Sequence, residues 1–411
     1  MPSVLVAFLG SSLALLTAAA PAQAPATGPA ARLGAKAAPK AAPGLTAEEA
    51  ALPFDEVALR AQSARRAEAP DEAIRWYRQG VRLRPSWDEG WWYMGTLQYE
   101  ADRYAEAAAA FQRFLALKPD AGPAWALRGL CEFRLRRYDD ALRHLARGLS
   151  LGSVGNVEIR KVVYYHLALL RIRASQFELA VEPLQSLARA EPETEALLDA
   201  CGLLVLRRPQ LPAEVPAEKK DLVRAAGGAA YSGFRARNDE MRQRFNALLQ
   251  RYPEEPNLHF GYGVFMMEID PEAAIKAHQR EVEIQPKAVS PRLEIAFAFQ
   301  RRGDQKAALP WAEEVVKLAP GLFAGHYALG RALLDLGQVS RGVAELEAAA
   351  RLAPESAEVR FALVRGYSLA GRAEDVARER EVFRKLSAQK KDGPATPGFA
   401  RDDTVSQEPP P

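Results

Sequence analysis

The chain has 411 residues, 48% of them hydrophobic, which is enough for a large core or for two or three domains and excludes an intrinsically disordered protein. Its 55 basic and 52 acidic residues nearly cancel, and the net charge of +3 is spread along the chain, which excludes a concentrated nucleic-acid footprint. The two cysteines, Cys131 and Cys201, lack the spacing of a disulfide framework or a zinc site, and buried thiols are their ordinary interpretation.

The N-terminus reads VLVAFLGSSLALLTAAAPAQA, an uncharged apolar run followed by small residues. This pattern is typical of a secretory signal, so we expect a signal peptide over residues 1–24, with cleavage after Ala22 fitting best, and a periplasmic or secreted protein. Because no Lys or Arg precedes the run, an uncleaved inner-membrane anchor is the alternative. The Ala/Pro-rich residues 25–50 are predicted to be a linker.

A repeat then dominates the chain. Pro85 and Pro119 are 34 residues apart, and Pro286, Pro320 and Pro354 keep the same step, each closing an apolar helical run such as FQRFLALKP. Small residues recur at fixed distances before these prolines in two successive helices, as at Gly95 and Ala107 or at Ala296 and Ala308. Small residues let helices approach closely while large residues fill the gaps, so the repeating unit is predicted to be a helical hairpin.

In chain order the repeats are predicted to form an N-terminal array over residues 51–206 and a C-terminal array over 221–390. Between them, RRPQLPAEVPAEKK predicts a proline-broken loop over 207–220, preceded by the helix ALLDACGLLVL and followed by a hairpin. Within that hairpin, AAGGAA indicates close packing or a kink. The charged residues before 390 suit the cap that a stack of repeats needs, and residues 391–411 are predicted to be a disordered tail.

The unit at 88–121 carries Trp91, Met94, Gly95, Ala107, Phe111 and Pro119. These residues resemble the tetratricopeptide repeat, whose 34-residue pattern has W, L-G, A, F and P at the same offsets, with Met here in place of Leu. The resemblance covers roughly residues 54 to 385. It implies an all-α, right-handed superhelical solenoid of antiparallel helix pairs, with about eight or nine repeats.

Three neighbouring aromatic residues must face different ways on the first helix of this unit, because a helix turns about 100° per residue. Trp91 shares a stripe with Met94, Gly95 and Gln98, which predicts a structural role, and Tyr93 is expected to be partly buried against a neighbouring repeat. The resemblance implies that the stripe of Trp92 lines the inner surface where partner peptides of the family lie.

Carrying these offsets along the chain gives a candidate peptide-binding groove, which we name the first-helix face. Its members are Trp92, Thr96, Tyr99, Leu130, Phe133, Arg134, Tyr165, Leu169, Arg173, His259, Phe297, Arg301, Tyr327, Arg331, Phe361 and Arg365. An aromatic lining dotted with arginines predicts a segment that carries hydrophobic and acidic residues. Tight packing between repeats is the alternative explanation for any one of these residues.

Other chemistry is not indicated. The five histidines form no metal-binding pair, and the sequence has no phosphate-binding glycine loop, no GxSxG motif and no Cys/His pair. We therefore predict no catalytic residues, no metal and no cofactor. The prediction is a noncatalytic scaffold that binds a protein or peptide and no nucleic acid, and that meets a membrane only through an uncleaved N-terminus. The alternative is an assembly component of a bacterial envelope complex that acts by self-association.

Overall fold

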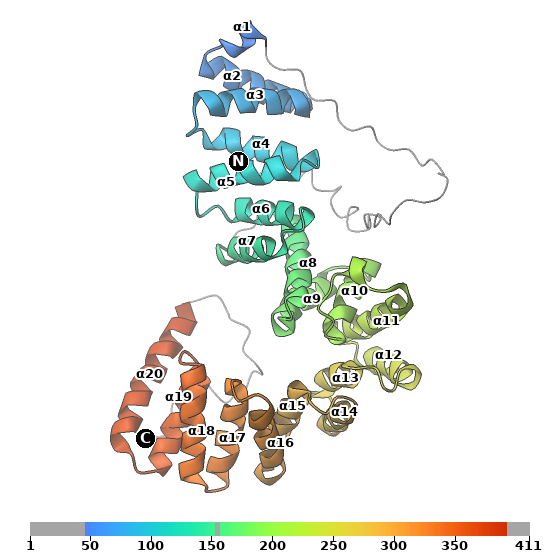
Figure 1. Cartoon of the computed structure of the whole chain (residues 1–411), viewed down its shortest axis with the longest axis vertical. Helices are drawn as coiled ribbons and strands as arrows, with labels where there is room; N and C mark the ends of the chain where they lie inside the picture. Colours follow the sequence, from blue (N-terminus) through green and yellow to red (C-terminus); the bar gives the residue numbers. More distant parts are fainter. Residues whose placement is uncertain (1–45, 153–156, 393–411) are drawn as a thin grey trace. The chain divides into compact units, whose positions relative to one another are not determined.

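The computed structural model describes residues 46–152 and 157–392, so the predicted signal peptide and most of the predicted tail lie outside the described residues. Every regular element in the described part is a helix (Figure 1). The chain divides into two compact units, and the division falls within one helix: the first unit holds the described residues up to Ala200 with Pro209–Val215, and the second holds Cys201–Arg208 and the described residues from Pro216.

The first unit contains four helix pairs preceded by one short helix. Its helices are α1 (Ala47–Ala50), α2 (Phe54–Arg66), α3 (Pro70–Leu83), α4 (Asp88–Glu100), α5 (Tyr104–Leu117), α6 (Gly122–Arg134), α7 (Tyr138–Ser150), α8 (Val157–Arg173) and α9 (Phe177–Ala190). The helix α10 (Glu195–Val205) begins in this unit and ends in the next.

The second unit contains five further pairs. After the short 3₁₀ helix η2 (Pro212–Glu214) come α11 (Ala217–Phe234), α12 (Asn238–Arg251), α13 (Leu258–Met266), α14 (Pro271–Ile284), α15 (Val289–Arg301), α16 (Gln305–Leu318), α17 (Phe323–Asp335), α18 (Val339–Leu352), α19 (Ala357–Leu369) and α20 (Ala373–Asp392). Within the described ranges, nine consecutive pairs pack as antiparallel hairpins and α10 has no such partner, which confirms the predicted helix-pair solenoid.

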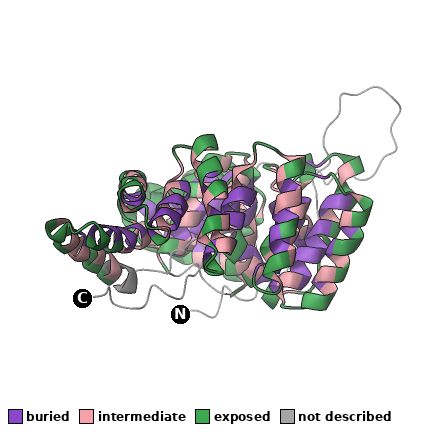
Figure 2. Ribbon diagram, turned by 90° about the horizontal axis from the view of Figure 1, so that it is seen from below, coloured by how far each residue is buried: buried purple, intermediate pink, exposed green. Residues whose placement is uncertain are grey.

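Each helix buries one stripe of side chains and exposes the opposite one, as the purple and green bands of Figure 2 show. Inside a pair, a small residue of the first helix faces a large residue of the second. A β-carbon on Gly95 would come within 2.8 Å of Phe111, and one on Gly330 within 2.7 Å of Leu346. The predicted pairing of small with large residues is therefore confirmed, and it sets how closely the two helices approach.

A recurring hydrogen bond ties each first helix to the turn before it. Six residues after a closing proline, a side chain donates to that proline's carbonyl oxygen: the indole Nε1 of Trp91 reaches Pro85 at 2.8 Å and that of Trp125 reaches Pro119 at 2.8 Å. Other residue types fill this position in the second unit, namely His259, Arg292, His326 and Arg360. Tryptophan, histidine and arginine share an N–H donor at the end of a long side chain, which explains why they replace one another here.

We expect Trp91→Phe to lower the free energy of unfolding by about 0.5–1 kcal/mol more than Trp92→Phe does, because only the first change removes this hydrogen bond. Both indoles are half-buried, so the loss of apolar area is similar in the two variants. Urea denaturation of both variants measures the difference. Equal losses would show that the bond gives no net stabilisation.

The least regular part of the chain is held by two carboxylates of the second unit. Glu255 is 9% exposed and accepts hydrogen bonds from Lys219 at 2.9 Å and from Arg208. Burial pushes the pKa of Glu255 up, but the bonds from Lys219 and Arg208 outweigh this effect and hold its pKa below the usual value. The helix α11 begins at Ala217, inside the range predicted to be loop, and it continues without a break through Gly227 and Gly228. The close-packing interpretation of AAGGAA therefore holds, and a kink does not.

The second of these carboxylates, Glu281 of α14, is fully buried and caps the short helix α13 from outside. Its two oxygens accept from the backbone N–H of Asn257 at 2.8 Å and of Phe260 at 3.1 Å. Asn257 has a left-handed backbone (φ 66°) and its own side chain makes no capping bond, so the distant carboxylate satisfies N–H groups that have no intrahelical partner.

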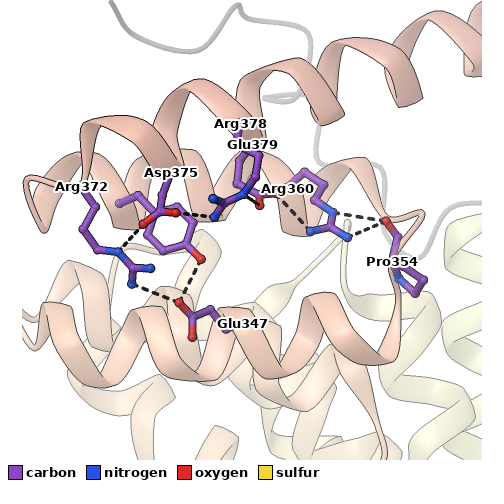
Figure 3. A network of polar contacts seen from close by, with 8 residues as sticks. Glu347, Pro354, Arg360, Arg372, Asp375, Arg378 and Glu379 are labelled. Atoms are coloured by element: carbon purple, nitrogen blue, oxygen red, sulfur yellow. Dashed lines mark hydrogen bonds and ion pairs between the residues drawn. The ribbon is translucent and has the colours of Figure 1, made fainter.

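The last pair is fastened by the polar network shown in Figure 3. The Nη1 of Arg372 and the hydroxyl of Tyr367 both donate to Glu347, at 3.1 and 2.9 Å, and Arg360 joins Glu379 of α20 at 3.1 Å. The network connects α20 with α18 and α19, so α20 is the second helix of the last pair as well as its charged outer surface. Among the described residues, no helix combines the length and apolar character needed to span a membrane.

Candidate functional site

The first of the three neighbouring aromatic residues, Trp91, is structural as predicted, since its indole binds Pro85 and its ring packs with the core of the first pairs. Tyr93 confirms the expectation of partial burial, with its ring centroid 5.7 Å from that of Tyr77 of the preceding pair. Trp92 is half-buried, and its ring lies 5.8 Å from Phe111 and 5.4 Å from the ring of Phe114. Trp92 therefore keeps an accessible edge while the second helix of its own pair supports it.

Two members of the first-helix face belong to the core. Leu130 is 4% exposed and Leu169 is 3% exposed, which leaves no surface for a partner. Leu130 packs in the cluster that joins α5, α6, α7 and α8. These two assignments to the groove are corrected: a neighbouring helix pair covers both side chains, which is the packing alternative that the sequence left open.

His259 is also a structural residue. Its Nε2 lies 3.0 Å from the carbonyl oxygen of Pro253, so it fills the position that Trp91 and Trp125 occupy in the first unit. The sequence offset placed it on the first-helix face, but α13 begins at Leu258 after the left-handed Asn257, which shifts the helix relative to the repeat. Its imidazole is thus committed to the turn.

Other members meet across successive first helices of the first unit. Phe133 of α6 lies edge-on to His166 of α8, with ring centroids 4.6 Å apart, and His166 is edge-on to Tyr165 at 5.4 Å. Burial lowers the pKa of His166 to about 4, so the ring is neutral near pH 7 and serves as an aromatic contact. Thr96 donates its hydroxyl to the carbonyl of Tyr93 at 3.1 Å, a bond within its own helix.

The second unit shows the same adjacency. The ring of Phe297 on α15 lies 6.5 Å from that of Tyr327 on α17, and the guanidinium of Arg331 lies 5.5 Å from the Tyr327 ring. Further along, Arg365 of α19 forms an ion pair with Asp335 of α17, and Phe361 contacts Phe383 of α20 at 5.6 Å. Predicted members on neighbouring first helices are therefore in contact within this unit.

Two arginines of the first unit rest on tyrosine rings that the sequence analysis missed. The guanidinium of Arg134 lies 4.9 Å from the centre of the Tyr104 ring, and that of Arg173 lies 4.6 Å from Tyr138. Each tyrosine is edge-on to a member of the first-helix face: Tyr99 meets Tyr104 at 5.7 Å, and Phe133 meets Tyr138 at 5.6 Å. The recurrence of Tyr104 and Tyr138 at a spacing of 34 was the signal that could have revealed these contacts.

The described residues suit binding more than group transfer. No group of three metal-ligating side chains occurs among them. Both cysteines are buried, and burial raises the pKa of the Cys131 thiol to about 12 and moves that of Cys201 in the same direction, which disfavours the reactive thiolate. Burial also raises the pKa of the Tyr99 hydroxyl to about 12. What remains accessible is a set of aromatic edges and guanidinium groups.

Comparison with known proteins gives one family. The tetratricopeptide repeat family model matches residues 94–153 and 327–394, one stretch in each unit. No curated protein sequence matches the chain.

Several solved structures of MamA are similar in part. One, described as a MamA RS-1 ArsTM double mutant, is 18% identical, with 40% of this chain and 93% of that chain covered and a TM-score of 0.38. MamA 41-end from Desulfovibrio magneticus RS-1 is 19% identical, with 40% and 92% covered and a TM-score of 0.36. TM-scores this low do not by themselves establish a shared fold.

The family match coincides with the hairpins α4 to α7 and α17 to α20, which show the small-against-large packing and the bond to the closing proline. The residues that first indicated the repeat, Trp91, Gly95 and Phe111, make these contacts. The chain is a tetratricopeptide repeat protein.

Proposed function

We propose that the protein is a noncatalytic scaffold that binds polypeptide partners along the first-helix face. The observation that carries the proposal is the adjacency of aromatic and arginine side chains on successive first helices, seen for Phe133 with His166 and for Phe297 with Tyr327 and Arg331. Half-buried aromatic rings offer large rigid contact area at a low entropic cost, and arginine adds directional hydrogen bonds.

Export is part of this proposal. The apolar run VLVAFLGSSLALLTAAA supports action in the periplasm or outside the cell, with the partner met there.

Site-specific photo-crosslinking tests the binding face. Benzoylphenylalanine in place of Tyr165 or Phe297 keeps an aromatic ring at the face, and the same residue in place of Gln112, exposed on the second helix α5, is the matched control. We expect adducts with a polypeptide from the two face positions and few from Gln112. Equal adducts from all three positions would move the site away from the face.

Peptide mapping of the adducts separates this proposal from the assembly alternative. Adducts whose second component is this same chain, together with a dimer mass in light scattering, would favour self-association. Adducts with a different protein and a monomer mass would favour the scaffold.

A further inference from the structure

The guanidinium groups of Arg134 and Arg173 carry charges that no carboxylate of the described chain neutralises. Both side chains are exposed, and neither forms an ion pair with a described residue. Asp102, the acid beside the Tyr104 ring, instead accepts the hydroxyl hydrogen of Tyr104. Elsewhere comparable arginines are paired, as Arg103 is with Asp71 at 2.5 Å.

The tyrosine rings hold these two arginines in place. A guanidinium stacked on an aromatic ring keeps its N–H edges free, and the ring limits the rotamers that the side chain samples. Because Tyr99 and Phe133 brace Tyr104 and Tyr138 from the side, both supports are themselves fixed. An anion that binds there meets a preorganised cation with apolar surface around it, which lowers the entropic cost of binding.

The spacing of the two sites favours one class of ligand. Arg134 ends α6 and Arg173 ends α8, and these two first helices contact each other. Packed helices lie about 8–10 Å apart. An extended peptide advances roughly 3.3 Å per residue, so acidic side chains three residues apart span about the same distance.

We propose that Arg134 and Arg173 form a paired recognition site for an extended polypeptide segment with two carboxylate side chains about three residues apart. This inference rests on the proposed function, because it names the chemistry of the partner that the first-helix face receives. Each guanidinium binds one carboxylate through two parallel N–H···O bonds, and the aromatic neighbours contact the residues between the acids.

A peptide array with the full chain tests the proposal. The array displays short peptides of varied sequence as matched sets in which two positions three apart are both glutamate, both glutamine or both phosphoserine. The double variant Arg134→Gln/Arg173→Gln removes the site. The matched control is Arg113→Gln/Arg147→Gln, which removes two exposed arginines from the second helices α5 and α7.

The unmodified protein and the control variant are expected to bind the glutamate peptides about tenfold more tightly than the glutamine peptides, and this preference should weaken as salt rises. The Arg134→Gln/Arg173→Gln variant should lose the preference while circular dichroism shows the same helix content. Binding without a glutamate preference, binding of phosphoserine peptides alone, or a preference that survives in this variant would each overturn the acidic site and leave peptide binding intact. Failure of every peptide to bind would overturn the proposed function as well.

Discussion

Gly202→Ala is expected to destabilise the second unit by more than about 3 kcal/mol, although alanine is the better helix former by about 1 kcal/mol. A β-carbon at this position of α10 would lie 1.8 Å from the carbonyl oxygen of Val223 and 3.1 Å from the backbone nitrogen of Gly227. The obstacles are backbone atoms of α11, which cannot rotate away as a side chain can. The two helices must separate, and the buried contacts between them are lost.

Hydrogen exchange with urea denaturation measures this effect. Amide protection in α10 and α11 should fall sharply in Gly202→Ala and stay unchanged in α4 and α5. The matched control is Gly321→Ala, because a β-carbon on Gly321 meets no atom within 4 Å and should change stability by about 0.5 kcal/mol or less. Wild-type protection in Gly202→Ala would mean that α10 and α11 lie farther apart in solution.

The features that depend on spacing along the chain could be predicted from the sequence. The step of 34 residues between Pro85 and Pro119 predicted the hairpins, and the small residues at fixed offsets predicted contacts such as Gly95 with Phe111. Both features follow from helix geometry, which repeats whenever the pattern repeats.

Features that depend on which chemical group meets another across helices could not be predicted in this way. His259, Arg292 and Trp125 share one role as donors to a proline carbonyl, yet their residue types differ so much that the pattern hides it. The capping of α13 by Glu281 joins residues 24 apart and replaces a local cap that the sequence lacks. Local propensity carries no information about such a long-range partner.

The candidate site shows the same distinction. The offsets correctly brought Phe297 near Tyr327, but they placed Leu130 and Leu169 on a surface when a neighbouring pair buries both. Burial at a given offset depends on the size of the side chains in the next pair, which one periodicity does not encode. The tyrosine supports of Arg134 and Arg173 follow a period of their own, on second helices, outside the stripe that defined the face.

Mild acid is expected to destabilise the second unit through His278 of α14. The ring is fully buried, neither of its nitrogens has a hydrogen-bond partner, and it stands where Phe111 and Leu346 stand in other pairs, eight residues before the closing proline. Burial, together with the nearby charge of Arg301, lowers the pKa of His278 to about 3.

Because the unfolded chain binds a proton at His278 below a pKa of about 6.5 and the folded chain does not, the stability is complete above that pH and is lost progressively as the pH falls toward about 3. Between pH 7 and pH 5 this residue alone should remove about 2 kcal/mol. The variant His278→Phe should flatten the pH dependence of urea unfolding over this range. The reciprocal variant Phe245→His, at the same repeat position of the preceding pair, should steepen it, since Phe245 is equally buried. If His278→Phe kept the acid sensitivity of the wild type, the ring would have to be hydrated or hydrogen-bonded in solution, and the loss of stability would have to arise from other groups.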